Sequence, residues 1–247
     1  SIELLHIFSL VHDDIMDDDN LRHGKKTIHN KWNIPIGILA GDAILALAFN
    51  RLNKLDNLIK ERFNSALIAV CEGQALDIEF ESKQNININD YMKMIELKTA
   101  HMIGLCAELG AIVSDVNKKT ILNMKKFGLI IGKAFQIQDD LLEATSKSSV
   151  MGKSLDSDIL LNKKTYVMIK ANELASEKID KIFKKHMNNP HQIKSEFQRL
   201  IEDEGIVYNT SKYIETLLKN AEELINGLDI KENYLLNFIK FIKGRKC

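Results

Sequence analysis

The stretch LLHIFSLVHDDIMDDD, residues 4–19, indicates the fold of this chain. Its apolar side chains recur every three or four residues, which is the spacing of one buried helix face. These side chains are Leu4, Leu5, Phe8, Val11 and Ile15. The same spacing returns along most of the 247 residues, whereas strand-like alternation is nearly absent. The sequence therefore predicts an all-α protein.

Few residues interrupt this helical pattern. The chain has 12 glycines and 2 prolines, about half the usual share and too few for the turns of a β-sandwich or β-barrel. We predict a single domain over residues 1–247 with about nine or ten helices and no internal repeat. Loops are expected at residues 20–33, 114–118, 146–164 and 187–191. The helices near Leu39–Phe49 and Leu129–Phe135 are apolar around most of their surface, so both should be central.

Composition excludes several classes of function. The 34 basic and 34 acidic residues cancel, so the chain as a whole has no electrostatic attraction for nucleic acid. Cys71, Cys106 and Cys247 show no paired spacing, which argues against a disulfide framework or a zinc site. The longest apolar stretch, Ile34–Phe49, contains Asp42 and is too short to span a membrane. With no signal peptide pattern either, we expect a cytoplasmic protein without a membrane span.

Two acidic clusters have the same form, with carboxylates at positions i, i+1 and i+4 near the end of a predicted helix. They are Asp13, Asp14 and Asp17, and then Asp139, Asp140 and Glu143. Like charges one turn apart repel, and they also oppose the helix dipole, unless a cation lies between them. Oxygen ligands without histidine or cysteine favour Mg²⁺. A single such cluster is most often a solvated helix end, but its duplication after a second apolar run favours a metal site.

A calcium loop does not fit the first cluster. Counted from Asp17, such a loop needs an oxygen ligand where Leu21 stands and a glycine where Arg22 stands. Basic residues instead accompany both clusters. They are Arg22, Lys25 and Lys26, then Lys153, Lys163 and Lys164, with Lys98 and Thr99 on a third helix. Together with the carboxylates they suit a diphosphate held through bridging metal ions.

These residues resemble the trans-isoprenyl diphosphate synthases, the family of farnesyl and geranylgeranyl diphosphate synthases. The resemblance runs through nearly the whole chain, as seven motifs in the expected order. They are Asp13-Asp14-Ile15-Met16-Asp17 with Leu21-Arg22; Gly41-Asp42; Gly73-Gln74 with Asp77; Lys98-Thr99; Phe127-Gly128 with Gly132; Phe135-Gln136 with Asp139-Asp140; and Gly152-Lys153 with Asp158-Ile159 and Lys163-Lys164-Thr165.

The resemblance implies an isoprenoid synthase-type helical bundle around a central cavity. It also implies a Mg²⁺-dependent prenyltransferase that condenses isopentenyl diphosphate with an allylic diphosphate, and a homodimer. Asp13, Asp17 and Asp139 would ligate Mg²⁺, about three ions per active site, with Asp14, Asp140 and Glu143 assisting through water or as hydrogen-bonded neighbours. Arg22, Lys98, Lys153 and Lys163 would hold the allylic diphosphate. The Lys98 carbonyl, the Thr99 hydroxyl and the Gln136 amide would lie beside the allylic cation.

Two positions and one expected segment depart from the family's pattern. Glu143 replaces the last aspartate of the second motif, and one extra methylene still permits coordination through water. His23 stands where a second arginine is usual, so we hypothesise that His23 binds isopentenyl diphosphate with a pH-dependent charge. A Gly-Lys-Arg-x-Arg-Pro segment is expected upstream of the first motif, yet the chain starts at Ser1 inside a helical pattern. We therefore expect N-terminal helices to be missing; if this is instead the whole protein, isopentenyl diphosphate binding is doubtful.

Product length in this family depends on the cavity wall below the first motif. Phe8 precedes Asp13 by five residues, about 7.5 Å along a helix, and Ser9 precedes it by four. A large Phe8 with a small Ser9 favours a C20 product, geranylgeranyl diphosphate, over C15 farnesyl diphosphate. The competing interpretation is that Phe8 only packs in the core.

Two other functions share parts of this pattern. A class I terpene cyclase has the first motif, but Asp139-Asp140-Leu141-Leu142-Glu143 follows the synthase form of the second. A non-catalytic subunit of a heteromeric synthase tends to lose the aspartates, whereas both clusters are present here. The chain-elongating enzyme is therefore the favoured prediction.

Overall fold

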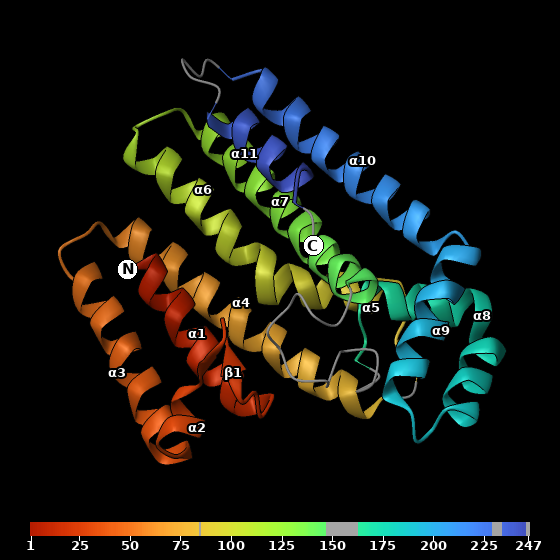
Figure 1. Ribbon diagram of the computed structural model, residues 1–247. Helices are drawn as coiled ribbons and strands as arrows, with labels where there is room; N and C mark the ends of the chain where they lie inside the picture. Colours follow the sequence, from red (N-terminus) through yellow and green to blue (C-terminus); the bar gives the residue numbers. More distant parts are fainter. Residues whose placement is uncertain (84, 147–162, 229–233, 246–247) are drawn as a thin grey trace.

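A computed structural model describes residues 1–83, 85–146, 163–228 and 234–245. Apart from one short hairpin, the regular structure of these residues is helical, which confirms the all-α prediction. The elements, labelled as in Figure 1, are α1 (Ile2–Met16), β1 (Leu21–Arg22), β2 (Lys25–Lys26), α2 (Ile28–Lys31), α3 (Ile34–Leu52), α4 (Asn57–Ser82), α5 (Ile88–Ile95), the π-helix η1 (Glu96–Ala100), α6 (His101–Val113), α7 (Lys118–Thr145), α8 (Tyr166–Lys185), α9 (Pro190–Asp203), α10 (Ile206–Asn226) and α11 (Tyr234–Lys243).

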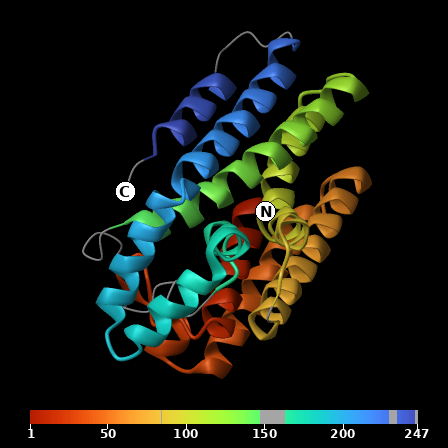
Figure 2. The same cartoon turned by 90° about the vertical axis from the view of Figure 1, so that its right-hand side faces the viewer.

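Helix α7 is the central element of the bundle. It packs against α6 on one side and α10 on the other, and α1 and α3 lie beyond α6 and α4 (Figures 1 and 2). Ile131, Ala134 and Ile137 of α7 are fully buried. The prediction that the helix around Leu129–Phe135 is central is therefore confirmed. Helices α8 and α9 lie together at one end of the bundle (Figure 2).

The buried apolar side chains form two clusters. The larger one joins α5, α7, α8, α9, α10 and α11, with Phe80 from the end of α4. The smaller one joins α1, α3, α4 and α6, and includes Leu5, Phe8, Phe63, Leu105 and Leu109. The acidic end of α1 therefore continues directly from a helix face that is buried against α4 and α6.

Local sequence sets several helix ends. Asn87 caps α5, because its side chain accepts hydrogen bonds from Asn89 and Asp90 while the Asp90 carboxylate accepts one from the Asn87 amide. Asn117 caps α7 in a similar way and Thr165 caps α8. The expected breaks at residues 114–118 and 187–191 are found where α6 gives way to α7 and α8 to α9.

The segment predicted as a loop at residues 20–33 has more structure than expected. It contains the β1–β2 hairpin and the single turn α2. His23 and Gly24 connect the two strands with φ values of 51° and 73°, as a tight primed hairpin turn requires. Because only two residues pair on each strand, no alternating sequence pattern marks them.

The prediction that the helix around Leu39–Phe49 is central is wrong. Helix α3 lies at the edge of the bundle, where it packs mainly on α1 through small residues such as Gly37 and Gly41. Its other face is exposed: Leu39 is 63% and Leu47 54% accessible. Apolar composition alone does not show whether a helix lies at the centre or at the edge of a bundle.

Helix α3 is also longer than the apolar stretch seen in the sequence, since it continues to Leu52. Among the described residues it is the one helix whose length and apolar composition would suffice to cross a membrane. A single helix of this kind is weak evidence, because the core helices of soluble proteins meet the same criteria.

Candidate active site

The π-helical segment η1 brings Lys98 and Thr99 between two other helices. A Cβ at Gly73 of α4 would lie 2.2 Å from the Lys98 backbone nitrogen, and one at Gly132 of α7 would lie 2.4 Å from the Ala100 Cα. Only glycine permits such close approach of helix backbones. Single π turns within α-helices are frequent at functional sites. The two glycines therefore fix η1 against both α4 and α7.

Lys98 joins the first acidic cluster to α4. Its Nζ lies 2.6 Å from Asp77 Oδ2 and 3.2 Å from Asp13 Oδ1. Burial alone would lower the pKa of Lys98, but the carboxylates of Asp13 and Asp77 outweigh burial and raise it. Lys98 therefore carries a fixed positive charge beside Asp13.

The other carboxylates of the first cluster also face cations. Arg22 Nε donates to Asp14 Oδ1 at 2.5 Å, and Asp14 is buried. Lys163 Nζ lies 3.6 Å from Asp17 Oδ2. Burial raises the pKa of both aspartates, with Arg22 opposing the rise at Asp14 and Asp13 adding to it at Asp17. A carboxylate cluster with raised pKa values is one that a multivalent cation would stabilise.

The second cluster lies near the C-terminal end of α7. Arg245 Nη2 lies 2.5 Å from Asp139 Oδ1, and its guanidinium stacks over the Phe135 ring at 4.2 Å. Asp140 is buried, and burial raises its pKa to about 6 although its hydrogen bonds lower it. Glu143 is half-buried one turn after Asp139. Asp139 is therefore placed at the surface of the site and Asp140 inside it.

Two sets of contacts join the clusters. Thr99 Oγ1 donates to Gln136 Oε1 at 2.9 Å, which links η1 to α7 three residues before Asp139. Lys163, which contacts Asp17, lies three residues before the start of α8. The backbone nitrogen of Tyr166, the first residue of α8, donates to Asp140. The two clusters, far apart in sequence, therefore belong to one site, together with Lys98, Thr99 and Gln136.

Lys153 is outside the described residues. Three other predicted residues lie apart from these contacts. His23 is exposed at the hairpin turn next to Arg22. Phe8 is 8% accessible within the smaller core cluster, where its ring lies 4.7 Å from that of His12. Ser9 is half-buried, and its hydroxyl bonds the His6 carbonyl of its own helix.

The donor chemistry fits Mg²⁺, but the protein alone does not complete a coordination sphere. In the part of the chain that the structure describes, no three acidic, histidine or cysteine side chains converge as a metal site. Asp13, Asp17 and Asp139 instead contact Lys98, Lys163 and Arg245. Mg²⁺ is usually bound by one or two carboxylates together with substrate phosphates. The carboxylates of the two acidic clusters suit such shared coordination.

Comparison with known proteins gives a consistent result. The polyprenyl synthetase family matches residues 1–203. The geranylgeranyl diphosphate synthase of Sulfolobus acidocaldarius is 36% identical over 253 residues, which cover 98% of this chain and 76% of that protein. The chain belongs to the polyprenyl synthetase family. This membership confirms the resemblance to short-chain trans-isoprenyl diphosphate synthases, the fold class and the enzyme class, a trans-prenyltransferase.

Further members of the polyprenyl synthetase family agree with this. The short chain isoprenyl diphosphate synthase of Methanothermobacter thermautotrophicus is 42% identical over 183 residues, which are 72% of this chain and 56% of that protein. The crystal structure of geranylgeranyl pyrophosphate synthetase from Pyrococcus horikoshii matches with a TM-score of 0.91 and 33% identity, over 99% of this chain and 78% of that one.

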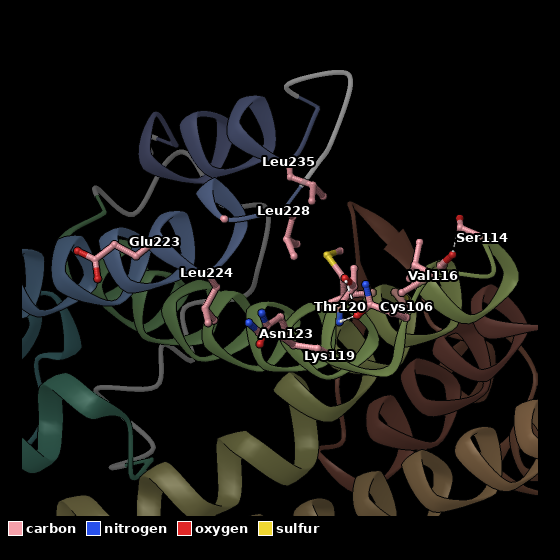
Figure 3. Close-up of a pocket in the computed structure, with 16 residues that line it drawn as sticks. Cys106, Ser114, Val116, Lys119, Thr120, Asn123, Glu223, Leu224, Leu228 and Leu235 are labelled. Carbon is pink, nitrogen blue, oxygen red and sulfur yellow. Dashed lines mark hydrogen bonds between the residues drawn. The ribbon is translucent and has the colours of Figure 1, made fainter.

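A cavity of about 1020 Å³ lies at the opposite end of this polyprenyl synthetase bundle. Figure 3 shows Leu224, Leu228 and Leu235 facing Cys106 and Asn123 across it. Its lining comes from the end of α6, the start of α7, and the adjoining ends of α10 and α11, and includes no carboxylate of either acidic cluster. The cavity is therefore separate from the aspartate site.

The sequence-based list of site residues missed three side chains that the fold supplies. Asp77 holds Lys98, Tyr91 donates to Asp140, and Arg245 reaches Asp139. Asp77 stands in the sequence motif Gly73-Gln74 with Asp77, but no role was predicted for it. Tyr91 and Arg245 have no such local signal.

Proposed function

We propose that this chain condenses isopentenyl diphosphate with an allylic diphosphate to a short-chain product, with Mg²⁺ as cofactor. The observation that carries the proposal is the single site formed by two carboxylate clusters around Lys98, Thr99 and Gln136. The names of the relatives, which are short-chain and geranylgeranyl diphosphate synthases, support the same reaction.

The carboxylates of this site would bind the metal, and its cations would bind the diphosphate. When bound, Mg²⁺ supplies positive charge that offsets the negative charge developing on the departing diphosphate. Asp13, Asp17 and Asp139 are the carboxylates that would hold it, with Asp14, Asp140 and Glu143 as hydrogen-bonded or water-mediated neighbours. Cationic contacts to the diphosphate come from Arg22, Lys98 and Lys163, and from Lys153, whose position lies outside the described residues. Lys98 carries its charge beside Asp13, because the carboxylates of Asp13 and Asp77 raise its pKa.

The groups beside the reacting carbon are neutral and polar. The Thr99 hydroxyl and the Gln136 amide are hydrogen-bonded to each other, and the Lys98 carbonyl belongs to the same segment. Carbonyl and hydroxyl oxygens stabilise an allylic cation by their dipoles without reacting with it. His23, exposed at the hairpin turn, is proposed to bind isopentenyl diphosphate in place of an arginine.

We propose geranylgeranyl diphosphate, C20, as the product, with C15 farnesyl diphosphate as the next candidate. The buried Phe8 ring among Leu5, Phe63 and Leu105 supports a wall below the first acidic cluster. Half-buried Ser9 leaves more room on the neighbouring face of α1 than a second aromatic would.

We also propose a homodimer, supported by the exposed apolar face of α3. Its accessible side chains include Ile34, Ile36, Ile38, Leu39 and Leu47. Contiguous exposed apolar surface of this kind marks contact sites between proteins. Light scattering of the wild type and of Leu39→Glu tests this: a dimer that becomes a monomer supports it, and a monomeric wild type contradicts it. The cytoplasmic location stays a prediction.

A product assay tests the proposed reaction. The chain is incubated with Mg²⁺, labelled isopentenyl diphosphate and geranyl or farnesyl diphosphate, and the products are separated by chain length. Elongated diphosphates, with C20 predominant, support the proposal. A hydrocarbon would indicate a terpene cyclase, and turnover only on addition of a second subunit would indicate a heteromeric enzyme.

A further inference from the structure

A buried chain of hydrogen bonds connects Tyr91 of α5 to Thr99 of η1. The Tyr91 hydroxyl donates to Asp140 Oδ2 at 2.6 Å. Gln136 Nε2 donates to Asp140 Oδ1 at 3.1 Å, and Thr99 Oγ1 donates to Gln136 Oε1 at 2.9 Å. Four side chains from α5, α7 and η1 therefore act in series, and the last two lie where we place the reacting carbon.

The carboxylate of Asp140 decides which way the Gln136 amide points. An amide has a donor end and an acceptor end, whereas an ionised carboxylate only accepts hydrogen bonds. Asp140 therefore holds the nitrogen of Gln136, and the oxygen is left to face Thr99. The reversed amide would place two acceptor oxygens against each other, which a buried site disfavours.

Asp140 is itself held in one orientation. Oδ2 accepts a second hydrogen bond, at 2.8 Å, from the backbone nitrogen of Tyr166 at the start of α8. Tyr91 is 2% accessible, and its ring lies edge-on to that of Tyr166 at 5.9 Å. Both carboxylate oxygens thus have partners within the protein. Without the Tyr91 hydroxyl, Oδ2 would keep only the Tyr166 amide, and the carboxylate could rotate away from Gln136.

We propose that Tyr91 is a positioning residue that acts through Asp140 to keep the Gln136 oxygen and the Thr99 hydroxyl directed at the reacting carbon. This inference rests on the proposed prenyl transfer. It separates the two neighbouring aspartates: Asp139 faces the diphosphate, and Asp140 orients the amide that faces the cation.

The test compares steady-state kinetics of Tyr91→Phe, Asp139→Asn and a matched control. Tyr91→Phe is expected to lower kcat about tenfold, with KM for both substrates and the Mg²⁺ concentration for half-maximal activity unchanged within about twofold. Asp139→Asn is expected to raise that Mg²⁺ concentration. Tyr213→Phe is the control, since its ring stacks on Tyr166 in the same aromatic group; it should keep wild-type kcat. Equal kcat values for Tyr91→Phe and Tyr213→Phe would overturn the inference.

A double-mutant cycle tests whether Tyr91 acts through Gln136. In a Gln136→Ala background, Tyr91→Phe should change kcat less than about twofold, because the amide that it orients is gone. A tenfold loss in both backgrounds would overturn the proposed route.

If circular dichroism shows that Tyr91→Phe is unfolded, Asp140→Asn replaces it. The side-chain amide introduced by Asp140→Asn accepts hydrogen bonds at one end only, so it cannot receive both the Tyr91 hydroxyl and the Gln136 nitrogen as the carboxylate does. The same loss of kcat at constant KM is expected, and wild-type kcat overturns the inference. If the wild-type chain shows no turnover, the proposed reaction is contradicted. If the wild type turns over and Tyr91→Phe has the same kcat, only the role of Tyr91 is contradicted.

Discussion

Replacing Gly73 by alanine tests how closely η1 is held by its neighbours. The new Cβ would lie 2.2 Å from the Lys98 nitrogen and 2.6 Å from its Cα, whereas ordinary contact begins at 3.4 Å. The backbone must therefore move by about 1.2 Å. The backbone of η1 cannot simply move toward α7, because the two already approach closely at Gly132. Even a single Cβ added to Gly132 would lie 2.4 Å from the Ala100 Cα. Lys98 and Thr99 should consequently be displaced by about 1 Å, and a misplacement of that size costs roughly 100-fold in rate.

The assay is kcat for prenyl transfer together with the thermal unfolding midpoint. Gly73→Ala should lower both. Gly110→Ala on α6 is the control, since an added Cβ there meets no atom within 4 Å. It should leave kcat unchanged and stabilise the helix by about 0.5–1 kcal/mol. Wild-type kcat and midpoint for Gly73→Ala would refute the close packing of η1 on α4.

Three further substitutions test other parts of the account. Phe8→Ala should lengthen the products beyond C20 and destabilise the fold by about 3 kcal/mol; an unchanged product distribution by mass spectrometry would remove Phe8 as the wall. His23→Arg should lower KM for isopentenyl diphosphate, since a guanidinium can bind two phosphate oxygens at once; an unchanged KM would contradict the role of His23. Glu108→Ala should destabilise the fold by about 1–2 kcal/mol in chemical denaturation, because buried Glu108 pairs with partly exposed Arg62 and Lys125. Glu79→Ala is the control: it removes an exposed pair with Lys83 and should cost less than about 0.5 kcal/mol.

Much of this fold could be predicted from local sequence. Helical spacing and caps are local, so the breaks between α6 and α7 and between α8 and α9 fall where expected. The edge position of α3 was missed, since apolar composition alone does not show whether a helix lies at the centre or at the edge of a bundle.

The candidate site was predicted in part for the same reason. The aspartates, Lys98 and Lys163 stand in motifs, and the structure brings them together. The contacts that orient them join distant residues: 21 positions separate Asp77 from Lys98, 49 separate Tyr91 from Asp140, and 106 separate Asp139 from Arg245. No sequence period reports such contacts, which depend on how the helices pack.

Both acidic clusters are proposed to bind one diphosphate through Mg²⁺. Calorimetric titration of the chain with inorganic diphosphate, with and without Mg²⁺, tests it most directly, without requiring turnover. We predict binding that needs Mg²⁺ and that Asp13→Asn and Asp139→Asn each weaken at least about tenfold, since each removes a ligand from the shared site. Equal affinity without Mg²⁺, or a loss confined to one of the two variants, would contradict the account.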